Sequence, residues 1–390
     1  MLIDCDTHII PRDAFDYMDE GSKRLRPLLR FDSRGLYTHS EFPARPPLVP
    51  GTTPLPSFSR ASGGSGTDLL GMVDLEARVR DMERLGVDLQ VVLPQFTPWS
   101  WSTLLDPALA RSLSRSYNRS MAGIMNRYPG RFIGVALAPL QNVAAAVDEV
   151  QWANDNGFKA VVADHTYAVR EHPYGETLGE HPELRPFFAK VHELDMVLYL
   201  HAVQHGHRAV NFRRFQRIGL DIFAPQDGHM TLVSLITSGL LDELPKLKVV
   251  YTEGGTAWIK PLAERLDARF ERNLPDYSRD AGTSVRKPAG PPSLVPKQEA
   301  RAKNQLRPSD YLRRNIYFTI ETEEPELAAA VGFLGAERFL YATDYPHDDP
   351  GGLMKWNDKE LFEGNREISQ AEKDLIAWQN AQRLFDGVQS

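Results

Sequence analysis

Two acidic residues and a histidine occupy every second position of a short segment near the amino terminus. Asp4, Asp6 and His8 lie two apart in an apolar run with the composition of a β-strand, and side chains two apart on a strand point to the same side. A carboxylate and an imidazole held at this spacing suit a divalent metal ion. A capped strand end with a surface histidine would give the same pattern, so the pair needs partners from elsewhere in the chain.

Another imidazole ends a second apolar run. His201 is the last residue of the run 196–201, where a strand would hold it rigidly. The loop that follows contains His205 and His207, which could form a local cluster with it, but ligands on strands keep their geometry better than ligands on a loop. We therefore predict His201 as a metal ligand, and assign His205 and His207 to a substrate loop or to solvent.

Two acidic residues follow apolar runs in the second half of the chain. Asp344 could bind a metal, orient a metal-bound water as a general base, or do both in turn. An aspartate that starts a turn before Pro346 is the structural alternative. Glu253 precedes Gly254 and Gly255, which let a ligand approach the backbone closely. It is a candidate acid–base group or a partner that orients a metal ligand, and a glutamate in a glycine-rich turn is the structural alternative.

These residues require a scaffold that brings the ends of distant strands together. Amphipathic stretches separate eight short runs rich in Val, Ile, Leu and aromatic residues, at 2–6, 88–93, 132–137, 158–162, 196–201, 247–251, 316–319 and 339–342. This alternation predicts a (β/α)8 TIM barrel, whose active site lies at the carboxyl ends of the strands. An open doubly wound sheet is the alternative, but no glycine-rich phosphate loop follows the first run.

Two segments interrupt the alternation. Residues 21–71 are rich in proline and glycine, and residues 272–315 are polar with several prolines and basic residues. Neither holds enough apolar residues for a core of its own, so we predict one domain over 1–390 with two long loop insertions. The first insertion follows the first strand and could cover the active site, whereas a mobile surface loop is as compatible with the second.

The composition excludes several classes of protein. The 45 basic and 52 acidic residues give a net charge of −7, which argues against a general nucleic-acid binder. The single cysteine, Cys5, excludes an intrachain disulfide and a cysteine-rich metal site. No apolar run approaches the roughly 20 residues of a membrane span, and the acidic start does not resemble a signal peptide. We therefore expect a cytoplasmic protein without membrane or nucleic-acid partners.

Taken together, the strand ends resemble the amidohydrolase superfamily. The sequence is most similar to the branch that includes aminocarboxymuconate-semialdehyde decarboxylase and the resorcylate and dihydroxybenzoate decarboxylases. The individual motifs are short, but their order at the first, fifth, sixth and eighth strand ends is specific. The resemblance spans nearly the whole chain apart from the two insertions, and it rests on residues 3–11, 200–201, 223–267 and 315–347.

The resemblance implies a distorted barrel with one divalent metal, Zn²⁺ with Mn²⁺ as the alternative, in a homodimer. The family's first-strand pair of ligands corresponds to Asp6 and His8, its fifth-strand ligand to His201 and its eighth-strand ligand to Asp344. The implied reaction is the non-oxidative decarboxylation of a small aromatic or unsaturated carboxylic acid. A hydrolase that attacks an amide, ester, lactone or C–C bond with a metal-activated water is the alternative, and a non-catalytic binding barrel is a third hypothesis.

One departure from the family concerns the residue that transfers the proton during decarboxylation. Several of these decarboxylases have a histidine at the sixth strand end, where this sequence has Glu253. A glutamate can move protons if burial raises its pKa, but it cannot be a cationic donor. His229, at the predicted start of a helix, is a candidate substitute and equally a candidate structural residue. Residues that could bind a substrate carboxylate or ring, and that could equally be surface or packing residues, are Arg12, Trp99, His165, Arg208 and His347.

Overall fold

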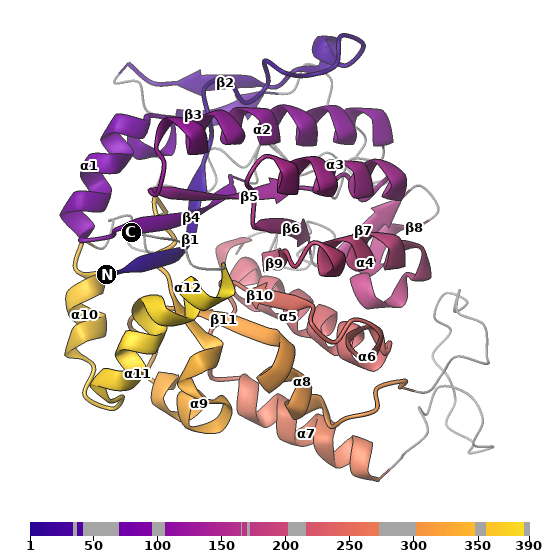
Figure 1. Ribbon diagram of the computed structural model, residues 1–390, viewed down its shortest axis with the longest axis vertical. Helices are drawn as coiled ribbons and strands as arrows, with labels where there is room; N and C mark the ends of the chain where they lie inside the picture. The colour runs from indigo at the N-terminus through magenta and orange to yellow at the C-terminus, as the bar shows by residue number, and fades with distance from the viewer. Residues whose placement is uncertain are drawn as a thin grey trace.

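A ring of parallel strands forms the centre of the protein. The computed structural model describes residues 1–33, 37–41, 70–95, 106–164, 166–169, 172–201, 216–272, 302–347 and 356–385. Within these residues, eight strands follow one another in the order β1-β4-β5-β6-β9-β10-β11-β12 (Figure 1). Their bounds are β1 (Ile3–Ile9), β4 (Leu89–Pro94), β5 (Phe132–Leu137), β6 (Ala160–Asp164), β9 (Val197–His201), β10 (Lys248–Tyr251), β11 (Ile316–Ile320) and β12 (Phe339–Tyr341).

The first and last strands of this order meet and nearly close the barrel. The backbone N–H of His8 donates a 2.7 Å hydrogen bond to the carbonyl oxygen of Tyr345, just after β12, and Thr7 pairs with Tyr345 as a parallel bridge. The predicted distorted (β/α)8 barrel is thereby confirmed. All residues of β1, β4 and β5 are buried, which explains why β4 and β5 are mostly apolar rather than alternating; the polar residues of β1 include the site residues Asp6 and His8.

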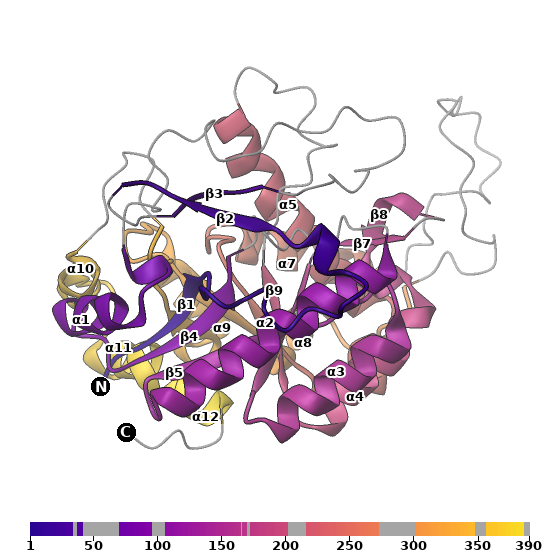
Figure 2. The same ribbon diagram turned by 90° about the horizontal axis from the view of Figure 1, so that it is seen from above.

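Helices surround the strands (Figures 1 and 2). Capping side chains start several of them: Asp74 accepts from Ala77 N, and Asn142 accepts from Ala145 N. Gly86 ends the first helix in a left-handed conformation with φ of 66°. The helices are α1 (Leu75–Leu85), α2 (Pro107–Arg127), α3 (Val143–Asp155), α4 (Arg185–Glu193), α5 (Gln216–Thr237), α6 (Leu240–Glu243), α7 (Ile259–Glu271), α8 (Pro308–Asn315), α9 (Leu327–Leu334), α10 (Asp358–Gly364), α11 (Gln370–Asp374) and α12 (Asn380–Leu384).

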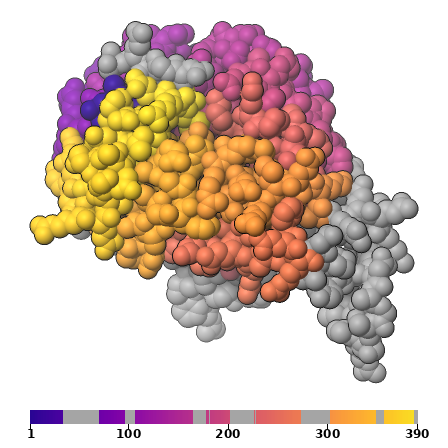
Figure 3. Space-filling model, turned by 60° about the horizontal axis from the view of Figure 1, so that its bottom comes forward, coloured from indigo at the N-terminus to yellow at the C-terminus, as the bar shows by residue number. Residues whose placement is uncertain are grey.

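The carboxy-terminal part of the chain covers one side of the barrel. Figure 3 shows its segments in orange and yellow forming much of one face, with a small indigo patch of the amino terminus beside them. Residues Leu375–Gln379 form a π-helical turn between α11 and α12. No helix in the described part of the chain is both long and apolar enough to cross a membrane.

The predicted start of α5 was wrong. The sequence pattern placed it near Met230, whereas the helix begins at Gln216, so His229 lies inside the helix. The interior Pro225 and Gly228 misled the prediction, because both residues disfavour helix interiors. Gly228 is needed where the helix crosses β10, because a Cβ atom there would lie 2.1 Å from the ring of Tyr251.

The two predicted insertions contain regular structure that the sequence pattern did not indicate. An antiparallel hairpin of β2 (Leu28–Phe31) and β3 (Tyr37–Glu41) lies within the first, and α8 forms the end of the second. A further hairpin, β7 (Thr166–Val169) and β8 (His172–Thr177), follows β6. Helix α8 (Pro308–Asn315) thus lies within the predicted bounds 272–315 of the second insertion.

Candidate metal centre

Five side chains with metal-binding atoms converge at the carboxyl end of the barrel. Asp6 and His8 lie on β1, His201 ends β9, and Glu253 and Asp344 follow β10 and β12. Because the carboxyl ends of parallel strands meet at one end of a barrel, residues far apart in sequence become neighbours there. The Nε2 atoms of His8 and His201 are 3.3 Å apart, and Asp344 Oδ1 is 3.1 Å from His8 Nε2.

These donors form two overlapping clusters rather than one. The ligand atoms of Asp6, His8, His201 and Glu253 all lie within 4.8 Å of one another, and so do those of His8, Glu253, Asp344 and His347. Of the four predicted ligands, three therefore share the first cluster, while Asp344 belongs to the second. Glu253, predicted as an acid–base group, is a member of both.

Asp6 shows that the cluster fits a cation. Its side chain is buried, and neither carboxylate oxygen makes a hydrogen bond within the described part of the chain. His8 Nε2 lies 3.6 Å from Asp6 Oδ1, which is longer than a hydrogen bond. A buried carboxylate without hydrogen-bond donors is costly unless a cation compensates it. Imidazole and carboxylate donors at this spacing fit one divalent metal ion.

The ring of His8 is oriented by its other nitrogen. Nδ1 lies 3.4 Å from the carbonyl oxygen of Pro94, a group that can only accept. Donation from Nδ1 leaves the lone pair of Nε2 directed at the cluster, the arrangement found in metal-ligating histidines. The same ring stacks on His347, with centroids 4.5 Å apart. His8 is therefore presented to the cluster in one orientation, with Nε2 facing the other donors.

Unusual backbone conformations place the two carboxylates that follow β10 and β12. Glu253 has φ of 52° and Asp344 has φ of 55°, a left-handed region that costs a non-glycine residue about 1 kcal/mol or more. After Glu253 the turn is fixed by Trp258, whose Nε1 donates to the carbonyl oxygens of Gly254 and Gly255, both at 2.8 Å. Residues held in such conformations concentrate at functional sites.

The charges of the clusters shift the pKa values of their members. Burial raises the pKa of Asp6 to about 7, against the opposing effect of His201 and His8. Burial acts on Glu253 as well, but the charge and hydrogen bond of His201 outweigh it and hold the pKa of Glu253 well below its usual value. The raised pKa that would let Glu253 carry a proton is therefore not found.

A family model described as amidohydrolase matches residues 3–387. The chain belongs to the amidohydrolase family. The match includes all five converging residues, and it confirms the resemblance that the strand-end motifs indicated.

Relatives of this amidohydrolase include the gamma-resorcylate decarboxylase of Rhizobium sp. (strain MTP-10005), 24% identical over 324 residues, which cover 80% of this chain and 86% of that protein. The 2-amino-3-carboxymuconate-6-semialdehyde decarboxylase of Dictyostelium discoideum is 22% identical over 311 residues, 79% of this chain and 75% of that protein. A solved 5-carboxyvanillate decarboxylase from Novosphingobium aromaticivorans, complexed with manganese and 4-hydroxy-3-methoxy-5-nitrobenzoic acid, has a TM-score of 0.70 at 22% identity and covers 99% of this chain and 96% of its own.

The other predicted site residues lie in different places. His347 is in the second cluster of the amidohydrolase, where Nδ1 is 2.8 Å from Asp344 Oδ1 and Nε2 is 3.0 Å from Gln95 Oε1. Arg12 is exposed, and its guanidinium carbon lies 5.1 Å from the ring centre of Phe31 in β2. It contacts the hairpin rather than the clusters. Trp99, His165 and Arg208 lie outside the described residues.

His229 is not a member of either donor cluster. Its ring stacks on Trp258 with centroids 3.8 Å apart, and it meets Tyr251 edge-on at 6.2 Å. Burial lowers the pKa of His229 to about 4, so the imidazole is neutral near pH 7. Its Nε2 makes no hydrogen bond with the described residues. These contacts favour the structural alternative over a role as a cationic proton donor.

Two further residues support the metal centre. Sequence reasoning missed Arg78, and it placed Asp4 on the strand face of Asp6 and His8 without assigning it a role. Arg78 on α1 is fully buried and donates to the carbonyl oxygen of His8 at 2.6 Å and to Thr7 Oγ1 at 2.6 Å. Asp4 accepts from Thr343 through N at 3.0 Å and Oγ1 at 2.6 Å, which ties β1 to the segment that carries Asp344. The available signal was the place of Arg78 on the apolar stripe of its helix, in line with Met82 and Leu85.

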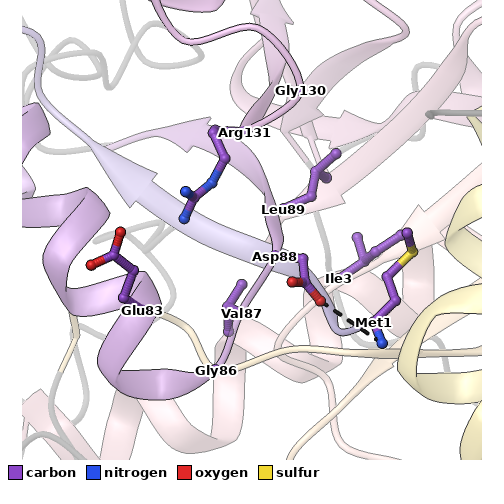
Figure 4. Close-up of a pocket in the computed structure, with 9 residues that line it drawn as sticks. All are labelled: Met1, Ile3, Glu83, Gly86, Val87, Asp88, Leu89, Gly130 and Arg131. Carbon is purple, nitrogen blue, oxygen red and sulfur yellow. Dashed lines mark ion pairs between the residues drawn. The ribbon is translucent and has the colours of Figure 1, made fainter. Parts of the chain in front are cut away.

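The described residues also line a cleft of about 430 Å³ far from these donors. It lies at the amino ends of β1, β4 and β5, among Met1, Glu83, Asp88 and Arg131 (Figure 4). The amino group of Met1 is 3.9 Å from Asp88 Oδ2. Because barrel enzymes carry their active sites at the opposite, carboxyl end of the strands, the cleft is separate from the candidate centre.

Proposed function

We propose that this amidohydrolase is a metal-dependent, non-oxidative decarboxylase of a small aromatic or unsaturated carboxylic acid. The observation that carries the proposal is the convergence of Asp6, His8, His201 and Asp344 at the carboxyl end of the barrel. The relatives and the solved structure described above, which cover most of the chain, are named as decarboxylases of such acids. Their names therefore support a carboxy-lyase in preference to a hydrolase.

The metal would be held by Asp6, His8, His201 and Asp344. Two imidazoles and two carboxylates suit Mn²⁺ or Zn²⁺. When bound, the cation would supply electrostatic attraction for the substrate carboxylate and an adjacent oxygen, and so orient the acid and stabilise developing negative charge. Asp4 and Arg78 hold the segments that carry these ligands through their hydrogen bonds to Thr343 and to the backbone of His8.

The reaction exchanges CO2 for a proton at one carbon: R–CO2⁻ + H⁺ → R–H + CO2. Glu253 is a poor source of this proton, because the neighbouring His201 and His8 keep it ionised. We propose that Asp344 and His347 form the acid–base pair. The proton would be shared between His347 Nδ1 and Asp344 Oδ1, which are 2.8 Å apart, while Gln95 holds the other side of the imidazole ring.

Isotope incorporation tests the reaction type. The Mn²⁺-loaded protein is incubated with a panel of hydroxybenzoic acids in D2O, and released CO2 and product mass are measured. A decarboxylase should release CO2 and place one deuterium on the carbon that carried the carboxylate. A parallel incubation in H2¹⁸O with amide, ester and lactone substrates tests the alternative: ¹⁸O in a product carboxylate, without CO2 release from any acid, would instead establish a hydrolase.

Substitutions connect the reaction to the site. His201→Ala should abolish CO2 release, because it removes a donor from the cluster. His192→Ala, on α4 and outside both clusters, is the matched control and should retain activity. Full activity of His201→Ala would contradict the site assignment. Association into a homodimer and a cytoplasmic location remain part of the proposal as predictions from the sequence.

A further inference from the structure

Glu253 occupies a central position among the donor atoms. Its Oε1 is 3.1 Å from His201 Nε2 and 3.7 Å from His8 Nε2. With metal–donor bonds of about 2.1 Å, neighbouring ligand atoms lie about 3.0 Å apart in an octahedral shell and about 3.4 Å apart in a tetrahedral one. The spacing of the Glu253 oxygen from His201 Nε2 is therefore that of adjacent ligands of one cation, while its spacing from His8 Nε2 is about 0.3 Å longer than the tetrahedral value.

The carboxylate that completes the cluster around Asp6 is that of Glu253. Asp6, His8, His201 and Glu253 form one compact set of donors, while Asp344 shares its set with His8, Glu253 and His347. Asp344 Oδ1 also accepts from His347 Nδ1 at 2.8 Å. A cation bound to both imidazoles would thus lie within reach of Glu253 at least as readily as of Asp344.

The backbone around Glu253 holds the carboxylate in place. The residue has φ of 52°, and its N–H is directed at Thr319 Oγ1 at 3.4 Å. The following glycine cannot be replaced without moving Tyr251, because a Cβ atom on Gly254 would lie 1.9 Å from the Tyr251 ring. A side chain that is fixed beside two imidazoles is suited to ligation, which requires a constant geometry.

We propose that Glu253 is a metal ligand and not the acid–base group, so that the donor set consists of Asp6, His8, His201, Glu253 and Asp344. The inference rests on the proposed function only in requiring a metal at this site. Three carboxylates and two imidazoles form an oxygen-rich set with more donors than a four-coordinate zinc site uses. Such a set raises the affinity for Mn²⁺, which accepts oxygen ligands and six-coordination, more than the affinity for Zn²⁺.

Metal titration of chelator-treated protein tests the proposal without an activity assay. The wild type and Glu253→Gln are titrated with Mn²⁺, followed by the electron paramagnetic resonance signal of free Mn²⁺, and with Zn²⁺ in competition with a chromogenic chelator. Glu253→Gln keeps the size of the side chain and removes its charge. Glu264→Gln, on the exposed side of α7, is the matched control.

We expect one Mn²⁺ per wild-type chain, a loss of affinity of more than about tenfold in Glu253→Gln, and no change in Glu264→Gln. The loss should be larger for Mn²⁺ than for Zn²⁺. Unchanged Mn²⁺ affinity in Glu253→Gln would overturn the ligand role of Glu253 while leaving the decarboxylase proposal intact. A wild type that binds no stoichiometric divalent metal would overturn both.

A second variant covers the case in which Glu253→Gln does not fold. Glu253→Asp retains the charge but draws the carboxylate back by one methylene group. It should bind Mn²⁺ more weakly than the wild type while its circular dichroism spectrum stays unchanged. Wild-type affinity in this variant would also count against the proposal, because a ligand role depends on the reach of the carboxylate.

Discussion

Arg78 Nη1 donates a hydrogen bond of 2.6 Å to the backbone carbonyl oxygen of His8. The same guanidinium donates to Thr7 Oγ1 and to Gln90 Oε1, and its central carbon lies 4.9 Å from the ring centre of Tyr345. One buried cation thus connects β1, β4 and the segment after β12. Because His8 is a proposed metal ligand and Tyr345 follows another, Asp344, this contact makes the position of the metal centre depend on α1.

Replacing Arg78 should therefore weaken both the fold and the metal site. Arg78→Met leaves several buried acceptors without a donor, and we expect a loss of about 3 kcal/mol in the free energy of unfolding. Metal affinity should fall about tenfold, as for other residues that orient ligands. Urea unfolding and metal titration measure the two effects. Arg80→Met, the same change at an exposed position of α1, should alter neither, and equal behaviour of the two variants would contradict the assigned role.

A glycine beside Tyr345 should be intolerant of a methyl group. A Cβ atom on Gly71 would lie 1.7 Å from the hydroxyl oxygen of Tyr345, which donates to Asp81 Oδ2 at 2.6 Å. Gly71→Ala must displace this ring, and overpacking of this kind costs about 1–3 kcal/mol. Thermal unfolding should show a lower midpoint. Gly21→Ala is the control, because an added Cβ atom there meets nothing within 4 Å. A similar fall of the unfolding midpoint in Gly21→Ala would show that the effect does not come from packing against Tyr345.

Metal removal should destabilise the protein through Asp6. Its buried carboxylate lacks hydrogen bonds within the described residues, and a cation that binds only the folded state stabilises it by about 2.7 kcal/mol at one hundred times its dissociation constant. Chelation should therefore lower the unfolding midpoint, and Mn²⁺ should restore it.

Asp6→Asn should make the metal-free protein more stable and its response to Mn²⁺ smaller. Above pH 7 the metal-free variant should be more stable than the metal-free wild type, because it buries no charge, while Mn²⁺ should stabilise it little. Calorimetry with and without Mn²⁺ measures this crossover. Asp148→Asn, at an exposed position of α3, should respond to Mn²⁺ as the wild type does; an equal response of Asp6→Asn would remove Asp6 from the ligand set.

His229 should make the stability of the protein fall in mild acid. Burial lowers its pKa from 6.5 to about 4 in the folded state, so between these values the unfolded chain binds more protons. The free energy of unfolding therefore decreases as the pH falls from 6.5 towards 4. His229→Phe keeps a ring beside Trp258 and removes the titration. Urea unfolding at a series of pH values should show a shallower decrease for the variant, and parallel curves for the two proteins would contradict the assignment.

The sequence by itself determined the barrel and the ends of its strands. Continuous apolar runs mark strands buried on both faces, and this local signal placed all eight within a few residues of their observed bounds. Asp6, His8, His201 and Asp344 could be selected because each lies on or just after such a run, and a parallel barrel brings those ends together. The family resemblance added their order along the chain.

Only the tertiary structure decided how these residues group. The left-handed backbone at Glu253 and the turn held by Trp258 direct a third carboxylate at the imidazoles of His8 and His201. The role of Arg78 was equally hidden, because its partners Thr7 and His8 lie about seventy residues away. The start of α5 was missed because Pro225 and Gly228 disfavour a helix interior by local propensity, whereas the helix continues through both. Differences of a few tenths of an ångström in the separation of donor atoms decide whether a residue binds the metal. These atoms belong to residues far apart in the sequence, so no local pattern of residue types predicts their separation.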